Sequence, residues 1–98
     1  MAYIELARYK LLAGVDANAL MEVEREIQQE VGPKHEGYAG RELLRTDDGT
    51  FVLIMRWENA ESAATWNNTL FASAAGQKLG SLVDRSSMSM EKLTSFQS

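Results

Sequence analysis

The chain alternates between segments with the two-residue period of β-strands and segments with the 3.6-residue period of α-helices. Residues 16–31 have the helical period, because their apolar side chains recur three or four positions apart: Leu20, Val23, Ile27 and Val31. Asp16 is a typical N-cap, and Pro33 ends this helix because proline cannot continue it. The remaining face of the helix is polar and includes Glu24.

The other elements follow from strand-forming residues, turn residues and small helix formers. The Asp47-Asp48-Gly49 segment is a hairpin turn signal, because Asp and Gly tolerate the positive φ of such turns. The full prediction, in chain order, is strand 2–12, helix 16–31, strand 38–46, strand 50–57, helix 59–68, a second helical piece at 70–83 interrupted near Gly76 and Gly80, and strand 87–96. This order predicts an α+β fold, the ferredoxin-like split βαβ arrangement with an antiparallel sheet. A chain of 98 residues fits a single domain, residues 1–98.

Both faces of the predicted sheet carry apolar side chains. In strand 50–57 the first face holds Phe51, Leu53, Met55 and Trp57, and the second face holds Val52, Ile54 and Arg56. The two helices of a split βαβ fold cover one face only, so a second copy of the chain is the simplest cover for the other. We therefore expect a homodimer, with Arg56 in an intersubunit salt bridge. The alternative is that Val52 and Ile54 reflect β-propensity on a solvated face.

Charge and composition exclude several classes of partner. The net charge is −4 and the basic residues are scattered, which argues against nucleic acid and anionic membranes. No apolar run approaches the ~20 residues of a membrane span, and the charged start lacks a signal-peptide core, so we expect a cytoplasmic protein. The chain has no cysteine, and its one histidine, His35, has no second His or Cys with which to share a metal, so no metal site is expected.

Several segments of the sequence resemble a known family, and the resemblance covers nearly the whole chain. Leu43-Leu44-Arg45, Phe51-Val52-Leu53-Ile54 and the segment from Trp57 to Trp66 are similar to the antibiotic-biosynthesis monooxygenase family, part of the dimeric α/β-barrel superfamily. The resemblance implies a homodimer whose two sheets face each other as a barrel, with a pocket in each subunit between sheet and helices. It also implies either cofactor-independent oxidation of phenolic rings by O₂ or, in another branch, haem degradation.

Family positions that carry polar groups are replaced in this chain. The anthrone-type oxygenases have an Asn at the position of Leu53 and a Tyr at that of Ala63, whereas Trp57 matches their Trp. In the haem-degrading branch, Trp66 matches a Trp, but the iron-ligating His falls on Gly76 and an Asn on Ala7. A haem protein needs an axial ligand, so haem degradation is disfavoured and no cofactor is expected.

Candidate site residues follow from the helix-facing side of the sheet and from the resemblance. The expected wall of the pocket is Trp57, Trp66, Leu53, Met55 and Tyr9, and the catalytic candidates are Trp66, Tyr9 and His35. Tyr9 either bonds a ligand or is a core Tyr with its hydroxyl at the surface. His35 is either a solvated loop residue or an acid/base at the pocket mouth. Arg41 is expected in a surface or interface ion pair. Asn67 and Asn68 either reach the pocket or cap a helix break, and capping is the favoured interpretation.

The leading hypothesis is a protein like the cofactor-independent monooxygenases, which acts on or binds a small aromatic or otherwise apolar molecule. One alternative is a dimer that binds a ligand without turning it over, and another is a structural or interaction dimer without a ligand. An open cavity beside Trp57 favours the first two, and a cavity filled by side chains favours the third.

Overall fold

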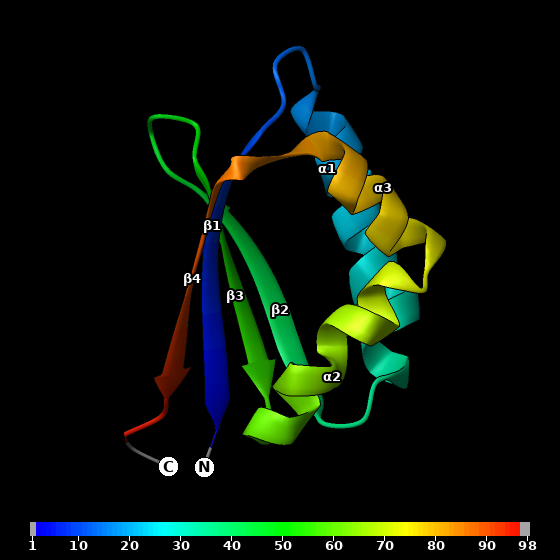
Figure 1. Cartoon of the computed structure of the whole chain (residues 1–98), viewed down its shortest axis with the longest axis vertical. Coiled ribbons are helices and arrows are strands. Elements are labelled where there is room, and N and C mark those ends of the chain that lie inside the picture. The colour runs from blue at the N-terminus through cyan, green and yellow to red at the C-terminus, as the bar shows by residue number, and fades with distance from the viewer. Residues whose placement is uncertain (1, 97–98) are drawn as a thin grey trace.

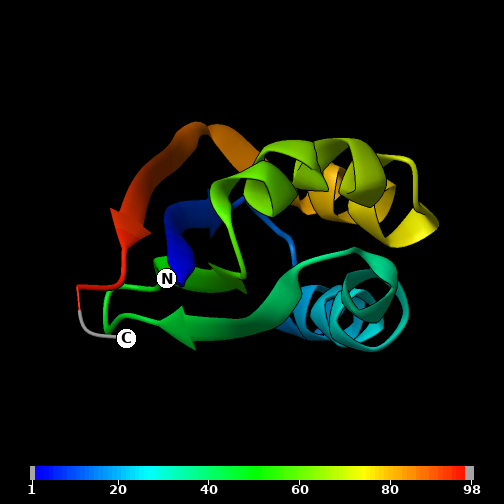
Figure 2. The same ribbon diagram turned by 90° about the horizontal axis from the view of Figure 1, so that it is seen from below.

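A computed structural model describes residues 2–96 as a four-stranded antiparallel sheet with its helices packed on one face (Figure 1). The view from below shows the helical layer on one side of the sheet and no element on the other (Figure 2). The elements are β1 Tyr3–Leu11, α1 Ala17–Glu26, the π-helical turn Ile27–Val31, the 3₁₀ turn Gly32–Lys34, β2 Tyr38–Arg45, β3 Phe51–Trp57, α2 Ala60–Phe71, α3 Ala74–Leu82 and β4 Val83–Thr94.

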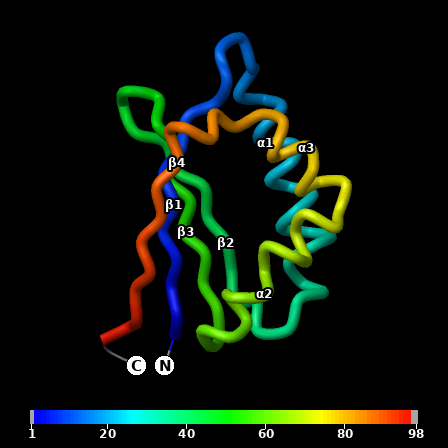
Figure 3. Tube along the Cα trace, in the orientation of Figure 1, coloured from blue at the N-terminus to red at the C-terminus, as the bar shows by residue number. Residues whose placement is uncertain are grey.

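The strand order is β2-β3-β1-β4, and every neighbouring pair is antiparallel. This order confirms the predicted α+β, ferredoxin-like split βαβ arrangement. The start of β1 and the end of β4 lie side by side, with Tyr3 opposite Thr94, as the chain trace shows (Figure 3). The strand order makes β1 and β3 the two central strands of the sheet.

Helix starts follow the capping rules. Asp16 accepts a hydrogen bond from the Asn18 backbone N–H at 2.9 Å, as predicted, and Asn59 accepts one from Ser62 N–H at 2.8 Å. The end of the first helix differs from the prediction, because regular α1 stops at Glu26 and the chain continues to Val31 as a π-helical turn. Pro33 lies in the 3₁₀ turn Gly32–Lys34 that follows, and no α-helix continues through it.

The break between the two helical pieces lies at Ala72–Ser73, a few residues after the predicted boundary near residue 69. The interruption predicted near Gly76 and Gly80 is wrong, because α3 runs unbroken from Ala74 to Leu82. Ser73 causes the break, because its hydroxyl caps α3 by accepting the Gly76 N–H at 3.0 Å. The predicted caps Asn67 and Asn68 are wrong for the same reason, since α2 continues past both to Phe71. The last strand begins at Val83, four residues earlier than predicted, and ends before Phe96.

The two faces of the sheet differ as predicted. Along β3, burial alternates, with Phe51, Leu53, Met55 and Trp57 buried against the helices. The opposite face keeps partly exposed apolar side chains across all four strands: Ile4, Leu6, Val52, Ile54, Leu44 and Leu93. Within residues 2–96, no helix has the length and apolar character needed to cross a membrane. The same residues contain no cluster of three or more His, Cys, Asp or Glu side chains suited to a metal ion.

Candidate functional site

A cavity of about 160 Å³ lies between the sheet and the α2–α3 layer. Its floor consists of side chains of all four strands, and its roof of side chains of α2 and α3. The lining residues of the strands are Glu5, Ala7, Tyr9, Arg41, Leu53, Met55, Val83, Met88 and Met90. Those of the helices are Ala63, Trp66, Asn67, Leu70, Phe71 and Leu79. Met88 and Met90 of β4 are about half exposed, at 47% and 46%, so they form the rim.

Four of the five residues expected in the pocket wall line this cavity, namely Tyr9, Leu53, Met55 and Trp66. Trp57 lies behind the wall, where it is 0% exposed and its ring centre is 5.2 Å from that of Trp66. Its indole Nε1 donates a hydrogen bond of 3.1 Å to Oε1 of Glu5. Trp57 therefore supports Trp66 and orients Glu5, and it is not itself a lining residue.

A buried ion pair closes one side of the cavity. Arg41 Nε donates to Glu24 Oε2 at 2.8 Å, and Arg41 Nη2 donates to Glu24 Oε1 at 2.7 Å. Both side chains are almost fully buried, at 1% and 5% exposure. This corrects the prediction for Arg41, which is in a buried ion pair and not at the surface, and it shows that Glu24, on the polar face of the first helix, is buried. A charged pair survives burial only with such bidentate geometry.

Three buried polar atoms around the cavity have no hydrogen-bond partner among residues 2–96: Tyr9 OH, Arg41 Nη1 and Trp66 Nε1. Arginine and tryptophan nitrogens can only donate, and a tyrosine hydroxyl can donate as well. The Arg41 guanidinium carbon lies 5.9 Å from the centre of the Trp66 ring. Because an unpaired buried donor costs about 1–3 kcal/mol, three in one cavity lined by these residues indicate that the cavity is suited to a ligand with acceptor atoms.

The electrostatic surroundings keep the Tyr9 hydroxyl protonated. Burial raises the pKa of Tyr9 far above its ordinary value, the Glu24 carboxylate raises it further, and Arg41 opposes them more weakly. Tyr9 is 2% exposed, so the sequence-based alternative of a core Tyr with its hydroxyl at the surface is not what the fold adopts. A neutral tyrosine at this place can donate a hydrogen bond to an acceptor atom of a ligand.

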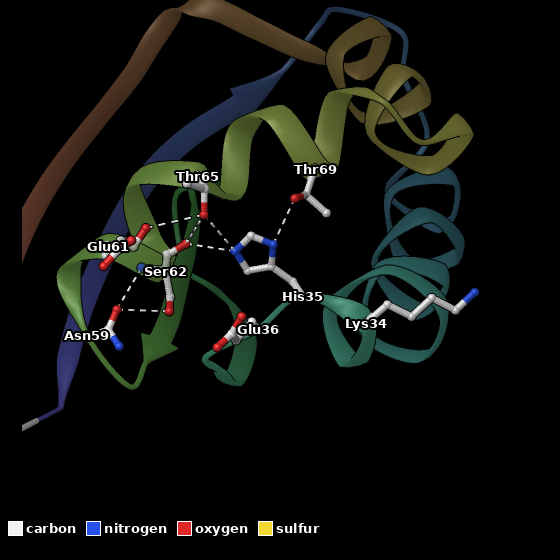
Figure 4. A pocket seen from close by; sticks show the side chains of 8 residues that line it. All are labelled: Lys34, His35, Glu36, Asn59, Glu61, Ser62, Thr65 and Thr69. Carbon is white, nitrogen blue, oxygen red and sulfur yellow. Dashed lines mark hydrogen bonds between the residues drawn. The ribbon is translucent and has the colours of Figure 1, made fainter.

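His35 lies in a separate, polar hollow of about 360 Å³ between the segment before β2 and helix α2 (Figure 4). Its Nε2 is 2.8 Å from the Ser62 carbonyl oxygen, which can only accept, so Nε2 carries the proton. Its Nδ1 then accepts from the Thr69 hydroxyl, also at 2.8 Å. Edge-on contacts with Trp57 and Trp66 complete its surroundings.

These contacts correct the interpretation of His35 as a solvated loop residue. The imidazole is half-buried, and both ring nitrogens are engaged by α2. His35 does not line the apolar cavity. Its ring contacts Trp66, a lining residue, edge-on, with the two ring centres 5.3 Å apart. Its contacts fix the position of the two tryptophans.

Glu5, Glu24 and Arg41 are buried polar residues near the cavity that were not among the predicted site residues. Glu5 is 7% exposed on β1, although its strand neighbours on the same face are Tyr3 and Ala7. A carboxylate at a position where the two-residue period calls for an apolar side chain is the signal that could have found it. The partner of Arg41 could not be found in this way, because it lies on a different element.

The position at which the haem-degrading branch has its iron ligand is closed in this fold. A Cβ atom at Gly76 would collide with the Leu70 carbonyl oxygen, since the first turn of α3 packs directly on the end of α2. A histidine there would require the two helices to separate. The residues present therefore do not fit an axially ligated haem.

No family model matches the chain, and no curated protein matches its sequence. Solved structures do match. SnoaB, a cofactor-independent oxygenase from Streptomyces nogalater, superposes with a TM-score of 0.73 at 14% identity, over 99% of this chain and 95% of that one. A protein of Nitrosomonas europaea, provisionally named an antibiotic biosynthesis monooxygenase, gives 0.75 at 13% identity, over 97% and 90%.

The chain has the fold of the antibiotic biosynthesis monooxygenases. A variant of MhuD, solved with two manganese protoporphyrin IX molecules per active site, also has this fold, with a TM-score of 0.71 at 18% identity over 98% of this chain and 96% of that one. The same fold is therefore present in a cofactor-independent oxygenase and in a protein solved with a bound porphyrin. The distinction between them depends on the side chains of the cavity.

Proposed function

We propose that this chain binds a small aromatic molecule in the cavity between sheet and helices and oxidises it with O₂ without a cofactor. One observation carries the proposal: an apolar cavity is bordered by three buried donors that no described residue satisfies. Such a cavity combines an apolar wall with a few fixed polar groups, as ligand sites do. The likeness in fold to a cofactor-independent oxygenase supports the reaction class.

The chemistry needs no external reductant. A phenol plus O₂ gives a quinone plus water, so the ring supplies all four electrons, one oxygen atom enters the product and the other leaves as water. The protein has to ionise the phenol, hold it and keep water away. Buried donors that point at the phenolate oxygen stabilise the ionised form.

The test uses phenols of one ring, with the protein free of flavin, metal and haem. We expect stabilisation of the fold by the ligand, because anything that binds the native state alone raises its melting temperature. We also expect O₂ uptake and quinone formation in a 1:1 ratio, measured with an oxygen electrode and by absorbance. Binding without O₂ uptake would refute the oxidation and leave the alternative of a binding protein without turnover. A failure of all one-ring phenols to bind would refute both.

The partly exposed apolar face of the sheet supports a second part of the proposal, a homodimer that buries this face. Ile54 lies at its centre, opposite Leu6 of β1 and Glu42 of β2. We expect Ile54→Lys to produce a folded monomer in sedimentation experiments, whereas Met21→Lys, a matched change at an exposed helix residue, keeps the dimer. A wild-type protein that is monomeric at micromolar concentration would refute this part.

A further inference from the structure

Glu5 is a carboxylate on the apolar floor of the cavity. It is 7% exposed, and its Oε1 accepts the 3.1 Å hydrogen bond from Trp57 Nε1. No hydrogen bond joins its second oxygen, Oε2, to another side chain in the described part of the chain. Glu5 therefore has one fixed oxygen and one that is free to act on a ligand.

Glu5 and Arg41 stand on opposite sides of Met55 in one row across the sheet. Met55 of β3 is paired with Arg41 of β2 on one side and with Glu5 of β1 on the other. All three side chains are buried on the helix-facing side and line the cavity. Two strand spacings of about 4.8 Å put the two backbones roughly 10 Å apart, with Met55 between them, so the two charged groups border the cavity from different strands. Arg41 is paired with Glu24 and not with Glu5.

Lys92 is the one other charged residue in this row, as the register neighbour of Glu5 on β4. Its side chain is exposed, and the structure gives it no ion pair with Glu5 within residues 2–96. The interior end of the row thus consists of one carboxylate acceptor, Glu5, and one cationic donor, Arg41 Nη1, with Trp66 Nε1 above.

We propose that Glu5 takes the proton of a phenolic hydroxyl, and that Arg41 Nη1 and Trp66 Nε1 then hold the resulting phenolate oxygen. In this step the ligand O–H bond breaks, its electron pair stays on the oxygen, and Glu5 becomes a neutral carboxylic acid. No oxidant or other reactant is needed. The inference rests on the proposed function, because it names the group that ionises the ligand in the same cavity.

The cavity also restricts the ligand. Its volume of about 160 Å³ is close to that of a ~150 Å³ protein cavity that takes up benzene, so one aromatic ring fits within it. A benzoate of similar size arrives with its charge already present and would meet the Glu5 carboxylate, which repels it. The site should therefore prefer a one-ring phenol to the corresponding carboxylate.

The experiment uses 4-nitrophenol, whose phenolate absorbs visible light, at an acidic pH at which the free ligand is colourless. Proton exchange with the buffer is measured by calorimetry in buffers of different ionisation enthalpy. We expect the wild-type protein to bind the ligand as coloured phenolate with no net proton release, because the proton moves to Glu5. The phenolate absorbance of the complex should not change with pH as long as ligand and Glu5 together hold one proton.

The variant Glu5→Gln has the same shape and keeps an oxygen for Trp57, but it cannot take the proton. It should bind the ligand colourless at acidic pH and develop colour only as pH rises, with release of up to one proton per ligand. It should also bind benzoate at least tenfold more tightly than wild type does, about 1.4 kcal/mol. Glu22→Gln, an exposed carboxylate on α1, is the matched control and should behave as wild type.

Three results would overturn the inference. Colourless binding to wild type would mean that Glu5 takes no proton, and colour with full proton release would mean that the proton goes to solvent. Equal colour in wild type and Glu5→Gln would mean that the donors alone ionise the ligand. In all three cases the ligand still binds, so the proposed function survives. Absence of 4-nitrophenol binding would overturn the inference, whereas the proposed function falls only if every one-ring phenol tested fails to bind. The wild-type measurements decide the matter even if Glu5→Gln does not fold.

Discussion

Arg41 of β2 and Glu24 of α1 form a bidentate ion pair in the interior, with two hydrogen bonds of 2.8 and 2.7 Å. The pair joins the sheet to the first helix and directs the third guanidinium nitrogen, Nη1, to a place where no residue in 2–96 binds it. The same residue thus contributes to stability through two nitrogens and to the candidate site through the third. Substitutions at Arg41 and Glu24 can separate the contribution to stability from the contribution to the site.

Removal of one member of the pair should be costly. We expect Glu24→Gln or Arg41→Met to lower the free energy of unfolding by about 3–5 kcal/mol, because each leaves a buried charge without its partner. The double variant should cost much less than the sum, since no isolated charge remains. Urea denaturation of the four proteins measures this coupling. The exposed pair Arg8–Glu91, joined by a single hydrogen bond of 3.0 Å, is the control and should contribute less than about 1 kcal/mol.

Tyr9→Phe should weaken ligand binding without weakening the fold. The Tyr9 hydroxyl is buried without a partner, so its removal should leave the free energy of unfolding unchanged or raise it by about 1 kcal/mol. Phenol affinity should fall, because one donor is lost. Ser73→Ala provides the contrast, since its hydroxyl caps α3 and its loss should cost about 1 kcal/mol. A destabilised Tyr9→Phe would indicate that the hydroxyl has a partner in the native protein.

Alkaline pH should destabilise the protein through Tyr9. Burial raises the pKa of Tyr9 in the folded state, whereas an unfolded tyrosine ionises near pH 10. Below that pH both states hold the proton and the stability is complete. Above it the unfolded state loses its proton first, so the free energy of unfolding falls as pH rises. Denaturation between pH 8 and about pH 11 should show a shallower fall in Tyr9→Phe than in wild type. Tyr38, whose pKa burial also raises, accounts for part of the remaining slope.

Two glycines of α3 should respond in opposite ways to substitution by alanine. Gly76→Ala should lower the free energy of unfolding by roughly 2 kcal/mol, because its Cβ meets the Leu70 carbonyl oxygen and the helices must separate. Gly80→Ala places its Cβ at an ordinary 3.7 Å from Arg85 and Phe71, so it should stabilise the helix by about 0.5–1 kcal/mol. Thermal or urea unfolding measures both. An unaffected Gly76→Ala would mean that the α2–α3 junction yields easily, which would reopen the position to a larger side chain.

The sequence by itself determined the elements and the faces of the sheet. Alternation along Phe51–Trp57 separates the buried face from the partly exposed one, and the helical spacing of Leu20, Val23 and Ile27 sets the buried side of α1. These periods are local properties, because neighbouring residues on a strand or helix have fixed relative directions. They also put Tyr9, Leu53 and Met55 on the face that lines the cavity, whereas Trp66 was expected there from the family resemblance.

Only the tertiary structure decided which polar groups meet. Glu24 and Arg41 are 17 residues apart and Glu5 and Trp57 are 52 apart, and no local pattern relates either pair. The same holds for His35. The sequence indicates a loop residue, but in the structure α2 packs against it and engages both of its ring nitrogens. The partners of these polar groups depend on how the helices lie on the sheet. Burial strengthens the hydrogen bonds that form, and it leaves the three cavity donors without partners among the described residues.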